Sequence, residues 1–348
     1  MSEFMKWDME NDASILSSAV ELTDAQARHR YLKDFSGMNY GQIEEIIEKR
    51  VKVFIKATAI MDEDYHGTIL EMGCGQGVVS ACLSRMPKVE KVLALDYSRV
   101  CVEELTPIVF DKLGADENKI VRILGSFNDM KLKDNSIDFI VSCGTLHHSE
   151  DLLKTARECY RVLKPGGWCV HSDRIRNYNG TNQGKKEIRA PISREKLAFR
   201  YGQSYVEKNI TSEMVSTHWL NLCDVEHNFL KENFRIYSFH MIKTGIKVID
   251  LFMYLFYKLI GNFIFKCKNY LNYSSLPIYP WFQHRGIFRT NPVKNLLFLC
   301  QKPPVYSIDK NTILKKQHFL RRGLRYIFVT NRLMERKYKN DLKNFLNL

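Results

Sequence analysis

The sequence lacks the features that mark several classes of protein. Its nine cysteines form no C-x-x-C pair and show no spacing typical of metal ligands, so we expect free thiols in a reducing compartment and no structural metal. The first residues lack the basic, apolar and small-residue order of a secretory signal, which predicts a cytoplasmic protein. No internal repeat or low-complexity tract is present. The 348 residues, 45% of them apolar, are expected to form a packed core with substantial additions.

Acidic side chains are scarce in the second half of the chain. The net charge is +13, but residues 1–180 carry 23 Lys and Arg against 28 Asp and Glu, whereas residues 181–348 carry 29 against 11. The basic half is expected to face an anionic lipid, a nucleic acid or an acidic substrate. A solvated surface without a partner is the alternative.

The chain also lacks a long apolar run that is free of charges. The most apolar stretch, residues 246–265, is interrupted by Lys247, Asp250 and Lys258, and each charge costs roughly 2.5 to 3.5 kcal/mol near the centre of a bilayer. In a helix, these charges fall on one narrow stripe and the rest of the circumference is apolar. The pattern favours a helix at a membrane surface, a lid over an oily substrate, or a core helix of an accessory lobe.

A glycine-rich turn organises the first half of the chain. Ile69 and Leu70, which suit the end of a buried strand, precede Gly73, Gly75 and Gly77, and a helix-compatible segment follows. This order predicts a strand, a tight turn and a helix, with a small polar ligand held against the backbone N–H groups of the turn. A dinucleotide fingerprint counted from Gly73 would place its third glycine at position 78, which is a valine.

The acidic-x-G-x-G-x-G pattern that begins at Glu71 resembles motif I of the class I S-adenosylmethionine (SAM) methyltransferases. Three further segments resemble later motifs of that family in the same order: a strand that ends at Asp96, 19 residues after Gly77, then residues 125–142, then the turn at 163–167. Four motifs in the right order are a specific signal. The resemblance implies an α/β, Rossmann-like fold, which is a doubly wound, mostly parallel seven-stranded sheet with an antiparallel last strand.

The resemblance also implies that SAM is the cofactor. The backbone of the glycine turn and the Glu71 side chain are expected to hold the methionine end, Asp96 the ribose hydroxyls, and Tyr97 the adenine. Ser126 stands where relatives often have an aspartate that accepts a hydrogen bond from the adenine amino group. The expected cofactor-binding residues are Glu71, Gly73, Cys74, Gly75, Gly77, Asp96, Tyr97, Ser126, Phe127 and Cys143.

Two adjacent histidines follow the predicted fourth strand, on the side where the acceptor is expected. Imidazole titrates in the range useful for a general base, so His147 and His148 are the candidate catalytic residues, with capping of the next helix as the alternative role. Asp173 and Arg174, just past the fifth strand, are weaker candidates for acceptor contacts. A base is needed only where the acceptor atom carries a proton.

The predicted strands divide the chain into parts. Residues 67–243 and 294–303 are expected to form the methyltransferase core, with strands at 68–72, 92–96, 120–124, 139–143, 168–172, 234–242 and 295–302. Residues 1–66 have the pattern of a mostly helical N-terminal cap. The long insertion at 244–293 separates the last two strands, so we expect it to cap the substrate site. Residues 304–348 are predicted to be a basic helical extension that contacts phosphate groups or docks on the core.

The fourth motif lacks the Asn-Pro-Pro-Tyr or Asp-Pro-Pro-Tyr sequence of adenine and glutamine amino-methyltransferases. We therefore expect a SAM-dependent methyltransferase similar to those of quinone and natural-product biosynthesis, acting on an oxygen or carbon of a small lipophilic acceptor. Peripheral contact with an anionic membrane through residues 246–265 and the basic tail is expected. The alternatives are an RNA methyltransferase that uses the basic half, and an inactive protein that binds a membrane or a partner.

Overall fold

The computed structural model describes residues 2–7, 17–61, 63–149, 151–173, 189–215, 222–236 and 296–304. The predicted insertion at 244–293, the tail from residue 305 onward and Arg174 lie outside these residues. Within the described part of the chain, no helix is both long and apolar enough to cross a membrane.

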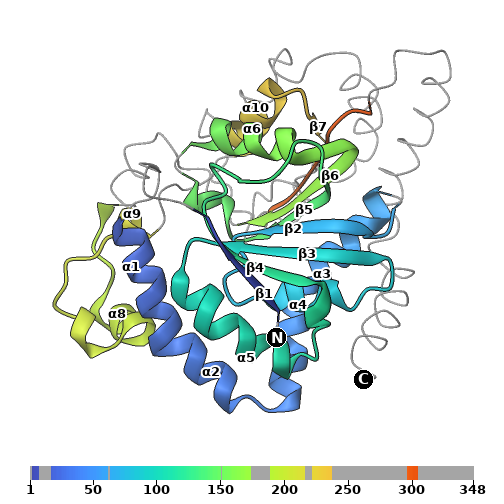
Figure 1. Cartoon of the computed structure of the whole chain (residues 1–348). Helices are drawn as coiled ribbons and strands as arrows, with labels where there is room; N and C mark the ends of the chain where they lie inside the picture. The colour runs from blue at the N-terminus through green and yellow to red at the C-terminus, as the bar shows by residue number, and fades with distance from the viewer. Residues whose placement is uncertain are drawn as a thin grey trace, which may run out of the picture.

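Eight strands form one mixed sheet in the order β1-β4-β3-β2-β5-β6-β8-β7 (Figure 1). All neighbours from β1 to β6 pair in parallel, and β8 is antiparallel to both β6 and β7. This topology confirms the predicted Rossmann-like fold with an antiparallel strand near one end. The strands are β1 Glu3–Lys6, β2 Gly67–Met72, β3 Val89–Asp96, β4 Ile120–Leu124, β5 Ile137–Cys143, β6 Leu163–Asp173, β7 Arg235–Ile236 and β8 Leu296–Gln301.

The central strands are apolar on both sides because helices cover both faces of the sheet. Ile69 and Leu70 of β2 are both fully buried, yet they belong to two separate apolar clusters because successive side chains point to opposite faces. Helices α3, α4 and α5 cover one face, and α6 and α10 cover the other (Figure 1). These helices are α3 Tyr40–Met61, α4 Val78–Ser84, α5 Thr106–Lys112, α6 Leu152–Val162 and α10 Leu222–Lys231.

The sheet has one strand more than predicted, and this strand lies at the start of the N-terminal region. Residues 3–6 form β1, which pairs with the outer edge of β4, and Trp7 N–H continues the pairing with a 2.9 Å hydrogen bond to the Leu124 carbonyl. The Trp7 ring packs over Gly125, where an added Cβ would lie 2.4 Å from it. Backbone pairing stabilises this short edge strand, and its sequence has no alternating pattern, so periodicity does not predict it.

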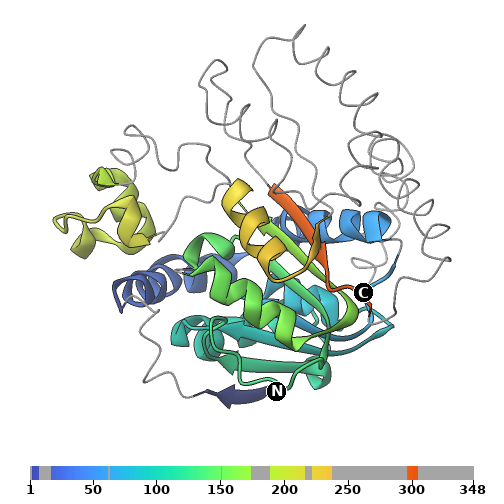
Figure 2. The same ribbon diagram turned by 90° about the horizontal axis from the view of Figure 1, so that it is seen from above.

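The other described N-terminal residues are helical. Helix α1 Ser17–Gln26 leads through the π-helical turn η1 Ala27–Tyr31 into α2 Leu32–Gly37 and then α3. Between β6 and β7, a small lobe contains α8 Arg194–Tyr201, η5 Gln203–Tyr205 and α9 Ser212–Val215. This lobe lies beside α1 (Figure 2), and its Leu197, Tyr201 and Ile210 pack against Leu22 of α1.

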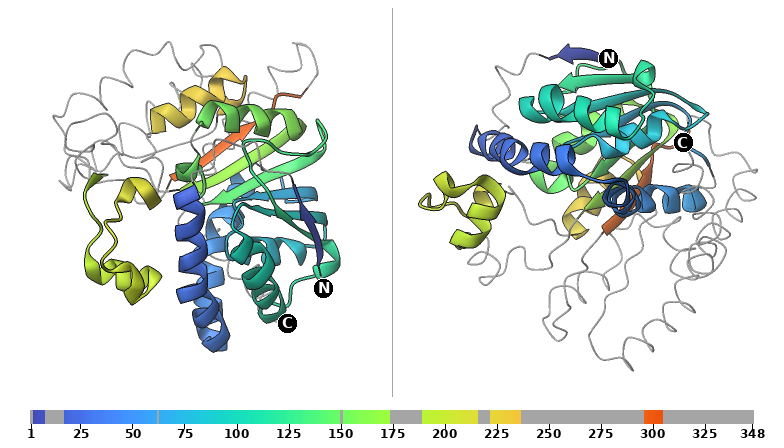
Figure 3. Two further views of the ribbon diagram at one scale, coloured as in Figure 1. Left: turned by 60° about the vertical axis from the view of Figure 1, so that its left-hand side comes forward. Right: turned by 90° about the horizontal axis from the view of Figure 1, so that it is seen from below.

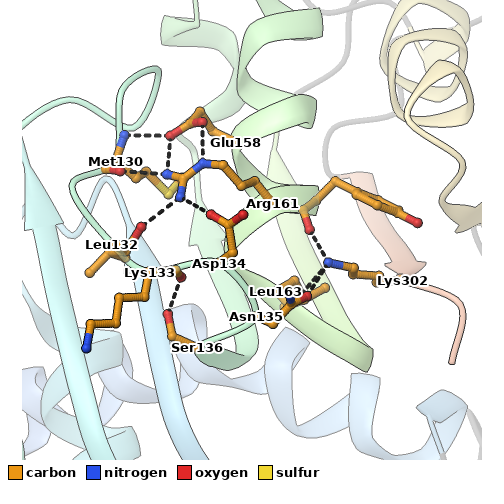
Figure 4. Close-up of polar contacts among 11 residues, drawn as sticks. Met130, Leu132, Lys133, Asp134, Asn135, Ser136, Glu158, Arg161, Leu163 and Lys302 are labelled. Carbon is orange, nitrogen blue, oxygen red and sulfur yellow. Dashed lines mark hydrogen bonds and ion pairs between the residues drawn. The ribbon is translucent and has the colours of Figure 1, made fainter. Parts of the chain in front are cut away.

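A buried lysine at the end of the closing strand ties β8 to α6 (Figure 4). The Lys302 ammonium group donates hydrogen bonds of 2.7 to 2.8 Å to the Tyr160 carbonyl, the Leu163 carbonyl and Asn135 Oδ1. The last carbonyls of a helix have no partner inside the helix, so a cation placed there satisfies them. Lys302 therefore anchors the antiparallel strand by capping α6.

An arginine of α6 holds the loop that follows β4 (Figure 4). The Arg161 guanidinium donates to the carbonyls of Met130 and Leu132 at 2.6 and 2.7 Å, and it pairs with Asp134 and Glu158 at 2.8 Å. This loop begins with the residues expected to contact adenine. Its far end is thus fixed to the rigid part of the fold.

Candidate active site

The three glycines of the turn after β2 have different surroundings. All have positive φ angles, of 68° at Gly73, 49° at Gly75 and 77° at Gly77, a region that favours glycine. A Cβ on Gly73 would lie 2.3 Å from Thr145, and one on Gly77 would lie 2.7 Å from Phe110, so both glycines permit close packing. A Cβ on Gly75 would meet nothing within 4 Å. Gly75 therefore faces the open side of the turn.

The Asp96 carboxylate at the end of β3 points at this turn. Its Oδ2 accepts a 2.7 Å hydrogen bond from Gly75 N–H, and its Oδ1 accepts a 2.9 Å bond from Ser98 N–H. Burial raises the pKa of Asp96 above its ordinary value, and the backbone donors oppose that rise. The acid and the turn thus form one preorganised unit at the carboxyl edge of the sheet.

Glu71 is buried at the end of β2 and is directed at the helix that follows the turn. Its Oε2 accepts a 2.8 Å hydrogen bond from Ser80 N–H and a 2.5 Å bond from Ser80 Oγ. Burial raises the pKa of Glu71 to about 8, although both hydrogen bonds favour the ionised form. The side chain thus satisfies a free N–H group in the first turn of α4, and its expected contact with the methionine end stays a prediction.

Helix α1 covers the residues that follow β3. Thr23 Oγ1 lies 3.2 Å from the Tyr97 hydroxyl, and the Asp24 carboxylate accepts hydrogen bonds from Ser98 Oγ and, at 3.4 Å, from Val100 N–H. Burial raises the pKa of Tyr97, so this phenol is neutral at physiological pH. The N-terminal helix therefore closes one side of the site.

Ser126 and Phe127 lie at the start of the loop after β4, and the protein itself holds both side chains. Ser126 Oγ accepts a 3.1 Å hydrogen bond from Asn128 N–H. Phe127 is buried in the apolar cluster on the α6 face. Their expected contacts with adenine stay predictions.

The loop after β5 approaches the glycine turn from the other side. Thr145 Oγ1 donates a 3.3 Å hydrogen bond to the Gly73 carbonyl. Cys143, half-buried at the end of β5, accepts a 3.6 Å hydrogen bond from Arg50 Nη1 of α3. Cys74 is buried within the turn. The structure thus brings the turn, Cys143 and Arg50 together at one edge of the sheet.

His147 and Asp173 form a hydrogen-bonded pair at the ends of neighbouring strands. Because β5 and β6 are parallel, the loop after β5 meets the last residue of β6. Asp173 Oδ1 lies 2.7 Å from His147 Nδ1, and Asp173 Oδ2 accepts a 3.1 Å hydrogen bond from His147 N–H. The Asp173 side chain is 1% exposed and that of His147 is 21% exposed. With Nδ1 against a carboxylate, the neutral imidazole keeps its proton there and presents Nε2 as an acceptor.

His148 is placed differently, although it is the next residue. Its Nδ1 is buried and has no hydrogen-bond partner in the described ranges, and its ring centroid lies 4.0 Å from that of His147. Burial lowers the pKa of His148 to about 3, and the neighbouring His147 acts in the same direction. The structure therefore separates the two candidates, because a carboxylate orients His147 alone.

A family model described as a methyltransferase domain matches residues 70–171, from β2 to β6. This segment contains the glycine turn, Asp96 and His147. Residues 70–171 thus form a methyltransferase domain of the class I SAM-dependent type.

Three relatives are similar to parts of this methyltransferase. The biotin biosynthesis bifunctional protein BioHC of Teredinibacter turnerae is 28% identical over 151 residues, 41% of this chain and 26% of that protein. Malonyl-(acyl-carrier protein) O-methyltransferase 1 of Ilyobacter polytropus is 26% identical over 211 residues, 60% of this chain and 71% of that protein. The ubiquinone/menaquinone biosynthesis C-methyltransferase UbiE of Desulfotalea psychrophila is 27% identical over 155 residues, 44% of this chain and 57% of that protein. The methyltransferase thus spans only part of each.

The turn of this methyltransferase fits SAM, the cofactor of the family. The open side of Gly75 leaves room for a ligand against the backbone, and a side chain there would occupy that room. Asp96 lies directly beside it and can accept hydrogen bonds from ribose hydroxyls. The identification confirms the predicted cofactor, while the contact of each residue with it stays a prediction.

Arg50 is a candidate functional residue of the methyltransferase that our sequence analysis missed. It lies on the face of α3 that Ile47 and Phe54 bury in the core, and it is near enough to Glu71 to favour the ionised form of that carboxyl. The sequence does contain a signal for it. Arg50 lies three residues after Ile47 and four before Phe54, so it is a lone charge on an otherwise apolar face of the helix. A guanidinium there could hold the carboxylate at the methionine end of SAM.

Proposed function

We propose that the protein transfers the methyl group of SAM to an oxygen or carbon atom of a small lipophilic acceptor, with His147 as the general base. The observation that carries this proposal is the 2.7 Å contact between His147 Nδ1 and Asp173 Oδ1, at the sheet edge that also contains the glycine turn. An imidazole that a buried carboxylate orients is suited to remove a proton as the acceptor attacks.

Bound SAM supplies an electrophilic methyl group on a sulfonium that leaves as a neutral thioether. The protein aligns the reactants and moves one proton. Asp173 keeps the imidazole proton on Nδ1, so Nε2 would accept the proton that the acceptor atom loses when it is methylated. Asp173 then stabilises the imidazolium, which returns its proton to water after the product leaves.

Two observations support the nature of the acceptor. Among the relatives, one is named an O-methyltransferase and another a C-methyltransferase, which favours oxygen or carbon as the methylated atom. The first residue of β8, Leu296, pairs with Asp173, so the chain that precedes β8 joins the sheet at the edge that holds His147. That preceding segment includes the most apolar stretch of the sequence, residues 246–265. This order in the sequence, an apolar stretch before a strand that starts at the site edge, supports an acceptor with a large apolar part.

Mass spectrometry of a cell extract incubated with the protein and isotope-labelled SAM tests the transfer and identifies the acceptor. With that acceptor, His147→Gln is expected to lower kcat by roughly 10²- to 10⁴-fold, the usual contribution of a general base. Asp173→Asn should act in the same direction, because an amide no longer holds the required tautomer. Neither change should alter the affinity for S-adenosylhomocysteine.

His66→Gln is a matched control, because His66 lies just before β2, at the opposite end of that strand from the turn, and its side chain is 43% exposed and paired with Glu63. It should leave kcat unchanged. A His147→Gln enzyme that keeps kcat within about threefold of wild type would refute the assigned base. Label that enters RNA instead of a small molecule would contradict the proposed acceptor.

A further inference from the structure

Four hydrogen-bond donors that lack a strong acceptor lie on η1, α3 and α8, near enough for the charges of two of them to act on one hydroxyl. They are the hydroxyls of Tyr31 and Tyr201 and the guanidinium groups of Arg50 and Arg200, which together form the arginine–tyrosine cluster. Arg200 and Tyr201 belong to α8, which packs against η1 and lies beside α1 (Figure 3), so the fold brings them to the part of the chain that contains Tyr31. Buried polar groups are normally hydrogen-bonded, so this gathering needs an explanation.

Tyr201 is the most enclosed member of the cluster. It is 3% exposed, and its buried hydroxyl has no hydrogen-bond acceptor among the residues that the structure describes. Burial raises the pKa of Tyr201, and the charge of the adjacent Arg200 and a weak hydrogen bond from its guanidinium oppose that rise. Arg200 is half-buried, and no carboxylate in the described ranges forms an ion pair with it. A phenol and a guanidinium therefore lie side by side without an acid.

Tyr31 connects this pair to the reaction site. It lies at the end of η1, half-buried against the apolar cluster that contains α3. Burial raises the pKa of Tyr31, and the charges of Arg50, Arg30 and Arg200 all oppose this rise. Arg30 is already neutralised by a 3.2 Å ion pair with Asp34. The other two arginines have no such carboxylate partner among the described residues.

The two ends of the cluster lie in different parts of the fold. Arg50 contacts Cys143 beside the glycine turn, where the carboxylate of the cofactor is expected. Arg200 belongs to the α8 lobe, which is not part of the segment from β2 to β6 that matches the family. Once the cofactor occupies Arg50, the guanidinium of Arg200 and the two hydroxyls still lack an anion. Carboxylates and phosphates are the ligands that such a set of donors binds.

We propose that the acceptor carries an acidic group, a carboxylate or a phosphate, which Arg200 binds together with the hydroxyls of Tyr31 and Tyr201. This inference rests on the proposed function, and it narrows the lipophilic acceptor to an amphipathic acid. The acid would be held at the α8 lobe, while the methylated atom lies near His147. Arg200 is thus a specificity-determining residue and takes no part in the proton transfer.

Calorimetry on the full chain tests this assignment with three probes that share one alkyl chain: decanoate, decyl phosphate and decanol. The titrations are run with and without saturating S-adenosylhomocysteine. When it is present, its carboxylate is expected to pair with Arg50, so an acidic probe can then bind only at Arg200. At least one of the two acids is expected to bind about tenfold or more tightly than decanol in both cases. The Arg200→Gln variant should lose this preference but keep its affinity for decanol and S-adenosylhomocysteine, and Arg200→Lys should restore part of the preference.

Arg194→Gln is the matched control, because this arginine of the same helix is 75% exposed and paired with Glu207. It should bind all probes as wild type does. Equal binding of the acids and decanol by wild type would overturn the inference, as would an acid preference that survives in Arg200→Gln. A loss of S-adenosylhomocysteine affinity in Arg200→Gln would also overturn it, because the anion would then be the carboxylate of the cofactor. If label transfer from SAM persists in any of these cases, the proposed function stands and only the acidic acceptor is rejected.

Discussion

The predicted cofactor side and the proposed acceptor side of this site differ in how their buried polar groups are hydrogen-bonded. On the cofactor side, Asp96 and Glu71 are buried, but backbone N–H groups of the turn and of α4 donate to both. On the acceptor side, His148 Nδ1 is buried without a partner, and the Tyr201 hydroxyl without an acceptor, in the described part of the chain. Asp96 and Glu71 are thus well hydrogen-bonded within the protein, whereas these two groups are not, although His147 next to His148 pairs with Asp173.

This difference indicates where specificity resides. A preorganised cofactor side can be shared by many methyltransferases, because the same turn and acid serve the same nucleoside. Unsatisfied groups on the other side lower stability until a ligand with matching chemistry satisfies them. The acceptor is therefore best inferred from the polar groups that lack partners in the free protein.

The largest expected effect is a pH-dependent change in stability caused by Glu71, which belongs to the well hydrogen-bonded set. Its pKa is about 8 in the folded protein against an ordinary value of 4.5. A raised folded-state pKa stabilises the protein at low pH, and this stability is lost as the pH rises, because the unfolded chain gives up its proton first. The free energy of unfolding of wild type, relative to Glu71→Gln, should fall by roughly 4 to 5 kcal/mol between pH 4 and pH 9.

Urea denaturation of both proteins across this pH range measures the difference. Gln keeps an acceptor for Ser80 and cannot ionise, so it isolates the charge. If the difference in unfolding free energy between wild type and Glu71→Gln is the same at every pH, the pKa of Glu71 is not raised in the folded protein. Glu71 would then be ionised at neutral pH.

The next largest effect is the loss of stability when either of two glycines in the turn is replaced by alanine. Gly73→Ala places a Cβ 2.3 Å from Thr145 and should destabilise the protein by roughly 2 to 4 kcal/mol, because a clash adds to the strain of a positive φ. Gly75→Ala meets no neighbour, so only the backbone strain of about 1 to 2 kcal/mol is expected. Gly75→Ala should nevertheless weaken S-adenosylhomocysteine binding, because it fills the ligand side. Equal stability of the two variants in urea would contradict the different roles of these glycines.

The cofactor side could be predicted from sequence because its chemistry is local. Gly73 to Gly77 and Glu71 lie within seven residues, and Asp96 ends the next strand, so spacing alone brought them together. The strand at 120–124 was also predicted with its observed bounds, since parallel strands covered on both faces are continuous apolar runs. The edge strand β1 has no such run, and only its pairing with β4 reveals it.

The acceptor side depends on contacts between segments that are distant in sequence. His147 and His148 were equivalent candidates, and the pairing of β5 with β6 decides between them by bringing Asp173 to His147. Asp173 itself was only a weaker candidate for acceptor contacts. Arg50 had a readable signal as a charge on an apolar helical face, whereas Tyr31 and Arg200 meet only through the docking of α8. The predicted insertion at 244–293 and the tail lie outside the described residues.

The most direct test of the account is calorimetric titration of S-adenosylhomocysteine into wild type and Asp96→Asn. Asp96 Oδ2 accepts a hydrogen bond from Gly75 N–H, and Gly75 has open space beside it, so wild type should bind one equivalent of S-adenosylhomocysteine. The Asn variant, which has lost one acceptor oxygen, should bind about tenfold or more weakly with its fold retained. Absence of binding to wild type, or equal affinity of the two proteins, would contradict the assignment of this turn and its acid as the cofactor site.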